Sequence, residues 1–302
     1  VGTSRRTWVT VRDTMVLLLI AIGLTPAFKM KFWNIGAEGQ ILVGGAATAA
    51  LMIYAGDSMP TPVLMILMFV ASLAAGMIWG IIPAIFKAYF NTNETLFTLM
   101  LNYVAMQIVT FCIVYWENPA GSNTVGIINS ATRAGWLPAL GGLTYGWNVL
   151  IVLVFTFGMY IYMKYSKQGY EVAVVGESQD TARYARINVK RTIIRTMGIS
   201  GGICGIAGFL LVSGASHTIS TSTAGGRGFT AIIVAWLSKF NAFVMILVSF
   251  FLVFMGKGAI QIASQFNLNE NASDVITGII LFFILGSEFF IRYRIAFTKA
   301  HK

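Results

Sequence analysis

The stretch Trp33-Asn34-Ile35-Gly36-Ala37-Glu38-Gly39-Gln40 comes directly before an apolar, small-residue segment of a mostly apolar chain. Two amides and a carboxylate therefore lie on a glycine-containing backbone where a hydrocarbon-buried helix begins. A charge at membrane depth costs roughly 2.5–3.5 kcal/mol on insertion scales, so an acidic residue there usually faces a bundle interior or an aqueous path. The alternative is that Glu38 lies at the interface and caps a helix N-terminus, where the helix dipole favours an anion.

The composition identifies a polytopic membrane protein. Of 302 residues, 57% are hydrophobic and only 11% are charged, whereas soluble domains carry about 25% charged residues. The net charge of +10 does not indicate a nucleic-acid partner, because the basic residues cluster in short loops between apolar segments, as cytoplasmic membrane loops do. Cys112 and Cys204 lie in apolar runs without metal-ligand spacing. Nothing divides the chain, so we expect one transmembrane domain over 1–302.

Hydropathy predicts an all-α bundle of about nine membrane segments, since a spanning helix needs about 20 apolar residues. The expected segments are 15–28, 35–54, 63–86, 96–116, 147–163, 196–212, 229–238, 242–255 and 276–290. The first is short and contains Pro26, so it spans only if residues from Val11 onward extend it or if the helix is irregular.

Loop charge predicts the orientation. The loop 164–195 and the C-terminal tail are both basic, so we expect both to be cytoplasmic and an even number of crossings to separate them. Only a division of the apolar run 229–256 at Lys239-Phe240-Asn241 gives an even number. We therefore expect a short half-helix over 229–238, which cannot cross lipid unless protein surrounds its loop.

The N-terminus departs from this pattern. The same parity places the loop 117–145 outside, and with it Arg5, Arg6 and Arg12. We interpret this as the absence of an upstream first helix from this sequence. The alternative is a cytoplasmic N-terminal segment followed by a re-entrant 15–28 helix.

Small residues at three- and four-residue spacing predict close helix packing, because they let backbones approach. They occur in two segments, as Ala71, Ala75, Gly76 and Gly80 and as Gly198, Gly201, Gly202, Gly205 and Gly208.

Catalytic signatures are missing. The chain has no G-x-x-x-x-G-K-[ST] phosphate loop and no H-E-x-x-H motif, and its histidines are His217 and His301. We therefore predict neither an enzyme nor a metal site.

Thr98 and Asn102 are four residues apart and share one helix face. Their role is either an interhelical hydrogen bond or a contact with a ligand. The segment 176–189 reads as a short capped helix on the cytoplasmic side, suited to a partner's groove or to a membrane surface.

Four motifs occur in the order found in one family. They are Asn34-Ile35-Gly36-Ala37-Glu38-Gly39-Gln40, then Asn93-Glu94 with Thr98-Leu99-Met100-Leu101-Asn102-Tyr103, then Gly176-Glu177 through Ala182-Arg183-Tyr184-Ala185-x-Ile187, then Gly226-Arg227-Gly228-Phe229-Thr230-Ala231-Ile232. Together they resemble the transmembrane permease subunits of bacterial ABC importers in the ribose/branched-chain amino-acid superfamily, nearest to its nucleoside and simple-sugar branch. The family usually has Gly where this chain has Arg186, which affects the geometry of the third motif.

The resemblance implies a type II-like importer permease in the bacterial cytoplasmic membrane, with a cytoplasmic C-terminus. Its expected partners are a cytoplasmic ABC ATPase, a second permease subunit (the same or a different chain), an extracytoplasmic substrate-binding lipoprotein and membrane lipid. ATP and Mg would be bound by the ATPase, so this chain would hold no cofactor. The residues that would dock the ATPase are Gly176, Glu177, Ala182, Arg183, Tyr184 and Ala185. Those that would line or shape the translocation path are Asn34, Glu38, Gln40, Thr98 and Asn102.

The expected function is ATP-driven import of a nucleoside or a related small polar solute such as a simple sugar. The alternative is a stand-alone secondary transporter, coupled to ions through Glu38 and Asp274. An integral-membrane enzyme is disfavoured because no acid/base or metal constellation is present.

Overall fold

The computed structural model describes residues 3–266, 275–280, 282–283 and 286–287. Asp274, the basic tail and residues 281, 284–285 and 288–290 of the predicted 276–290 helix lie outside these residues. The chain divides into two compact units, Val1–Ser249 and Phe250–Lys302, and the fold is described here for the first. A single permease domain over 1–302 stays a prediction.

The described residues form helices and no strands. In chain order the helices are α1 (Ser4–Lys29), α2 (Ala37–Ala55), α3 (Thr61–Phe90), α4 (Glu94–Tyr115), α5 (Gly146–Tyr165), α6 (Lys167–Glu177), α7 (Gln179–Tyr184), α8 (Val189–Leu211) with the π-helical turn η1 (Val212–Ser216), α9 (Arg227–Leu237) and α10 (Ala242–Gln265). The all-α prediction is confirmed.

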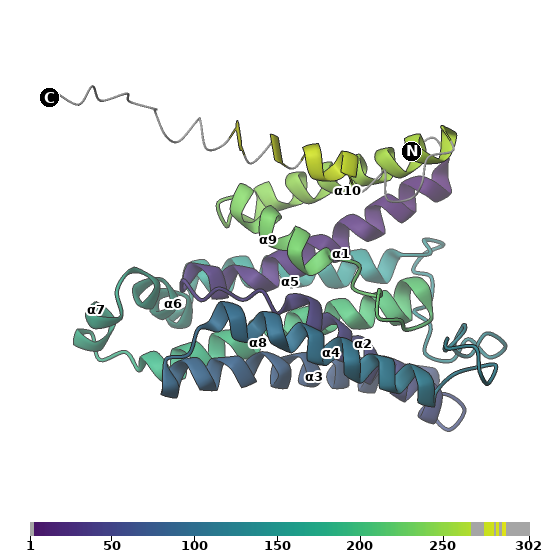
Figure 1. Ribbon diagram of the computed structural model, residues 1–302, viewed down its shortest axis with the longest axis horizontal. Coiled ribbons are helices and arrows are strands. Elements are labelled where there is room, and N and C mark those ends of the chain that lie inside the picture. Colours follow the sequence, from purple (N-terminus) through teal and green to yellow (C-terminus); the bar gives the residue numbers. More distant parts are fainter. Residues whose placement is uncertain (1–2, 267–274, 281, 284–285, 288–302) are drawn as a thin grey trace, which may run out of the picture. The chain divides into compact units, whose positions relative to one another are not determined.

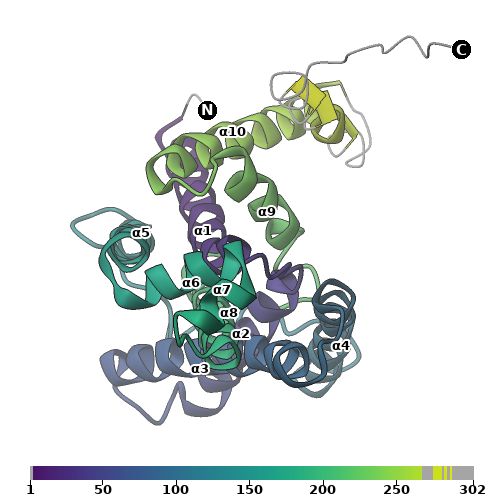
Figure 2. The same ribbon diagram turned by 90° about the vertical axis from the view of Figure 1, so that its left-hand side faces the viewer.

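Helix α8 is the centre of the first unit. It packs against α1, α2 and α3 (Figures 1 and 2), and its side chains are almost all buried. Along α3, α4 and α5, less than a third of the residues in the most apolar stretch are buried, as expected for helices that face lipid. The apolar periphery and the packed centre together support a multi-pass membrane protein.

Glycines allow α8 to approach its neighbours, as their spacing predicted. A Cβ added to Gly201 would overlap the carbonyl oxygen of Gly76 in α3, and one added to Gly205 would overlap that of Ser72. On the other side of α8, a Cβ on Gly44 of α2 would lie 2.6 Å from the Cα of Gly205. At these crossings the backbones themselves are in contact, so no larger residue fits.

Several helix limits differ from the predicted segments. Helix α1 is continuous over 26 residues, so residues before Met15 do extend it, and its length exceeds the 20 or so residues of a span. Within the described part of the chain, six helices are long and apolar enough to cross a membrane, namely α1, α3, α4, α5, α8 with η1, and α10. Helix α9 is shorter, and nine membrane segments stay a prediction.

The break predicted at 239–241 is present, between α9 and α10. Lys239 and Phe240 both have positive φ, 49° and 60°. The N–H of Lys239 donates to the carbonyl of Trp236 at 3.0 Å, and that of Phe240 to the carbonyl of Ala235 at 3.1 Å. This pair of bonds is a Schellman motif, which satisfies the last carbonyls of a helix and turns the chain away from it.

Candidate functional site

The non-helical connection between α1 and α2 is the first part of the candidate site. Lys31, with φ of 57°, closes α1 with a second Schellman motif: its N–H donates to the Phe28 carbonyl, and that of Phe32 to the Ala27 carbonyl, both at 2.9 Å. The chain then runs without helical structure to Gly36, the residue before the start of α2. Backbone groups in this buried connection need other partners, because an unpaired buried N–H or C=O is costly.

Helix α4 supplies those partners. The Asn102 amide donates to the carbonyl of Ile35 and accepts from the N–H of Gly39, both at 2.9 Å. The Thr98 hydroxyl accepts from the N–H of Ile35 at 3.2 Å. Both side chains are buried. Of the two roles left open for this helix face, the interhelical hydrogen bond is the one that the structure shows.

The two amides of the motif contact each other. Asn34 and Gln40 lie 3.4 Å apart in both amide N-to-O pairings. The Asn34 side chain also accepts from the N–H of Gly36 at 3.0 Å and donates to Ser200 of α8 at 3.3 Å. The connection is therefore fixed to the central helix as well as to α4.

Glu38 contacts a segment 190 residues further along the chain. Its carboxylate accepts from the N–H of Gly226 at 2.6 Å and from that of Gly228 at 2.8 Å. These amides belong to the first turn of α9, and Gly226 has a left-handed φ of 71°. A Cβ on Gly228 would lie 2.7 Å from the nearer carboxylate oxygen.

Both interpretations of Glu38 thus hold in part. The residue is only 4% exposed inside the bundle, and it caps a helix N-terminus, but that of α9 rather than of its own helix. A carboxylate at this position satisfies free amide groups and complements the positive end of the α9 dipole. We call this contact the Glu38 clamp.

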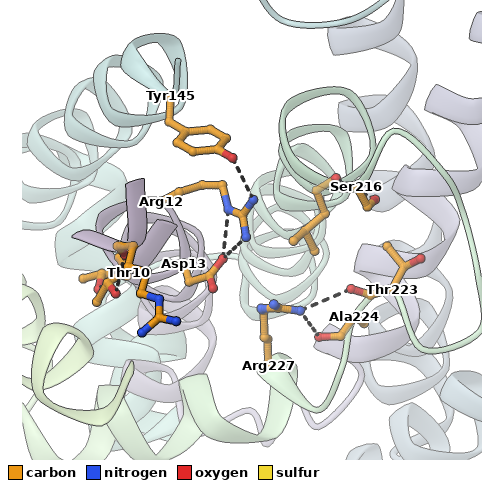
Figure 3. A network of polar contacts seen from close by, with 11 residues as sticks. Thr10, Arg12, Asp13, Tyr145, Ser216, Thr223, Ala224 and Arg227 are labelled. Carbon is orange, nitrogen blue, oxygen red and sulfur yellow. Dashed lines mark hydrogen bonds and ion pairs between the residues drawn. The ribbon is translucent and has the colours of Figure 1, made fainter. Parts of the chain in front are cut away.

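A polar network lies beside the start of α9 (Figure 3). The Arg12 guanidinium donates to one Asp13 oxygen at 2.8 and 3.0 Å and to the Tyr145 hydroxyl at 3.4 Å. Arg227 donates to the carbonyls of Thr223 and Ala224, each at 3.3 Å. From the sequence, Arg12 entered only the prediction of orientation, and Asp13 was missed. The signal for Asp13 was an acidic residue just before an apolar run.

The α6–α7 segment is the second part of the candidate site, at the opposite end of the unit from the 117–145 loop (Figure 1). A Cβ on Gly176 would overlap the Lys29 carbonyl at the end of α1. Ser178 caps α7 by accepting from the N–H of Thr181 at 3.2 Å. Ala182 is fully buried among apolar residues of α1, α3, α6 and α8.

The outer surface of α7 is exposed. Arg183 pairs with Asp180 at 3.1 Å, Tyr184 is 92% exposed, and Glu177 and Ala185 also face solvent. Arg186 has a φ of 57°, and a third Schellman motif ends α7 here. The left-handed conformation explains why glycine suits this position.

Comparison with known proteins identifies the family. The family described as the branched-chain amino acid transport system permease component matches residues 9–285. The chain belongs to this permease family. Its relatives include the glucose ABC transporter permease protein TsgB13 of Haloferax volcanii, 29% identical over 92% of this chain and 76% of the relative. No solved structure matches the chain.

Two further relatives of this permease are named for nucleosides. The guanosine ABC transporter permease protein NupP of Bacillus subtilis is 29% identical over 92% of this chain and 80% of its own length. The nucleoside ABC transporter permease protein NupB of Lactococcus lactis is 26% identical over all of this chain and 84% of its own length.

The structure brings the five predicted path residues of this permease together around one helix break, and the six predicted docking residues onto α6, α7 and the residue that follows. It also shows a hydrogen-bond partner that the motifs did not reveal, Ser200, which accepts from Asn34. Ser200 lies within the glycine-rich stretch of α8, and nothing in the sequence distinguished it. Among the described residues, no three His, Cys, Asp or Glu side chains are placed to hold a metal ion.

Proposed function

We propose that this chain is the membrane-spanning subunit of an ATP-driven importer of nucleosides or simple sugars. The observation that carries the proposal is the family match over 9–285, together with relatives named for guanosine, nucleosides and glucose. The comparisons give no support to an ion-coupled secondary transporter.

The proposed ATPase-docking surface is α7 with the end of α6. Ala182 anchors α7 in the apolar core while Arg183, Tyr184 and Ala185 face outward. A short helix that is buried on one side and exposed on the other can transmit a displacement by a partner to α1. The route is α6, whose Gly176 contacts the end of α1 at Lys29. ATP and Mg would be held by the ATPase, and this chain would bind neither.

In this proposal, the path residues shape the channel more than they contact solute. The amides and hydroxyl of Asn34, Thr98 and Asn102 are committed to backbone or side-chain partners. The Glu38 clamp keeps α9 inside the bundle as a half-helix. A path with few free polar groups suits a permease, since solute must bind weakly enough to leave.

The proposed assembly contains a second permease subunit and an extracytoplasmic binding lipoprotein. Two different Bacillus subtilis proteins, NupP and NupQ, both named guanosine ABC transporter permease protein, match this chain. That pair favours two different permease chains. The α6–α7 end and the C-terminus would face the cytoplasm of the cell and the 117–145 loop would face outward.

Reconstitution tests the function. The chain, its second permease and its ATPase would be placed in proteoliposomes with the binding protein, and uptake of labelled guanosine and glucose measured with and without ATP. We expect ATP-dependent uptake that fails without the ATPase. Accumulation by this chain alone, driven by an ion gradient, would show that the proposal is wrong.

A variant separates docking from folding. Tyr184→Ala removes an exposed side chain, so we expect an unchanged melting temperature and reduced solute-stimulated ATP hydrolysis. Ala182→Arg is a poorer probe, because Ala182 is buried and an arginine there would disturb α7 itself. Equal ATPase stimulation in wild type and Tyr184→Ala would remove α7 from the docking surface.

A further inference from the structure

A cavity of about 500 Å³ lies between the last turns of α1, the end of α5 and the connection from α9 to α10. It is separate from the Glu38 clamp and from the docking surface of α7. Its volume is within the range of roughly 300–1,000 Å³ that small-molecule sites occupy. The charged residues of its wall are all basic and come from α1, from α5 and from the α9–α10 connection, as Lys29, Lys164 and Lys239.

Among the residues that the structure describes, no carboxylate lines the cavity. The Lys164 ammonium donates to the Tyr160 hydroxyl at 3.0 Å and lies over the Tyr160 and Tyr165 rings. Lys29 and Lys239 form no ion pair within the described part of the chain. Three lysines on the wall of one space make it positive, and an anion in that space would be attracted to them.

The other wall is apolar. Ile22 of α1, Met159 of α5 and Met245 of α10 line it. Lys29 and Lys164 lie in the last turns of α1 and α5, the ends that the proposed orientation places at the cytoplasmic surface. Basic side chains at the membrane surface above an apolar wall match a molecule with an anionic head and a hydrocarbon tail. Basic pockets between transmembrane helices on this side of a membrane are suited to phospholipid headgroups.

We propose that this cavity binds the phosphate-bearing headgroup of an anionic phospholipid of the cytoplasmic leaflet. Lys29, Lys164 and Lys239 surround the phosphate, and the acyl chains follow the apolar wall into the bilayer. Bound lipid links α1 and α5 to the connection after the half-helix α9. The proposal rests on the proposed orientation of the permease but not on its solute.

Lipid binding is measured on the purified full chain in detergent, by native mass spectrometry during titration with phosphatidylglycerol or phosphatidylcholine of the same acyl chains. We expect phosphatidylglycerol to bind preferentially. Each lysine removed should weaken its affinity about fivefold, and the triple variant Lys29→Gln/Lys164→Gln/Lys239→Gln should weaken it on the order of a hundredfold. The single variant Lys239→Gln, in an exposed connection, supplies the fivefold test should the triple variant fail to fold.

The matched control is Lys167→Gln/Lys190→Gln/Arg191→Gln, which removes the same charge from the same end of the protein without touching the cavity. It should keep the wild-type affinity. Equal loss in the control, or equal binding of the two lipids, would overturn the proposal. Displacement of phosphatidylglycerol by millimolar inorganic phosphate or glycerol 3-phosphate would assign the cavity to a soluble anion instead. No ATPase or solute is present, so failure here leaves the proposed transport function standing.

Discussion

Replacing Glu38 by alanine should release the N-terminus of α9. The helix has 11 residues, and isolated helices shorter than about 12–15 residues are marginal in water, so α9 depends on its contacts. The variant leaves the amides of Gly226 and Gly228 without the carboxylate. A hydrogen bond to a charged group contributes roughly 1.5–3 kcal/mol, and the desolvation of the carboxylate offsets part of it.

We therefore expect Glu38→Ala to lower the free energy of opening α9 by about 3 kcal/mol, the low end for two such bonds. Because the amides exchange from the opened state, this loss of free energy corresponds to amide exchange that is on the order of a hundredfold faster. Glu38→Gln keeps one acceptor and turns an NH₂ group toward the other amide, so about half the loss, roughly 1.5 kcal/mol, should follow.

Hydrogen exchange with mass spectrometry on peptides covering 226–237 measures the effect in the purified chain. Asp57→Asn is the control, because Asp57 is exposed in the turn after α2 and the same charge is lost. Uptake in proteoliposomes is measured in parallel. Unchanged exchange in α9 with lost uptake would refute the clamp and show that Glu38 acts on the solute directly.

Three further outcomes are expected. Gly201→Ala should destabilise the bundle by about 2 kcal/mol through overlap with the α3 backbone, whereas Gly158→Ala, where a Cβ meets nothing within 4 Å, should not lower the melting temperature. Arg186→Gly should raise stability by about 0.5–1 kcal/mol, because glycine adopts the left-handed conformation without steric cost; a lower melting temperature would contradict this. Burial lowers the pKa of His217, a backbone hydrogen bond at Ser213 opposes this, and the Arg12 charge lowers it further, so the folded state favours the neutral ring. When the pH falls below about 6.5, the usual pKa of histidine, the unfolded chain binds more protons than the folded one. Stability is therefore lost on acidification. His217→Asn, which tolerates the positive φ, should flatten the melting temperature between pH 7 and 5, and an unchanged slope would exclude His217 as the source.

Much of the fold was predictable from local pattern. Hydropathy located the long helices, and the spacing of small residues predicted close packing by α3 and by α8, because both patterns depend on neighbouring residues of a single helix. The break at 239–241 was also predicted, from the expected parity of membrane crossings, and the structure contains the break itself. The motif at 34–40 was recognised as the polar start of a helix.

Tertiary structure alone decided what those polar side chains contact. Glu38 could have capped its own helix, and nothing near it in the chain indicates the amides of Gly226 and Gly228. Ala182 is one small residue of an exposed-looking helix, yet it is the buried anchor of α7. A hydrogen-bond partner or a buried face depends on which remote segments pack together, and the hydropathy of one segment does not contain that information.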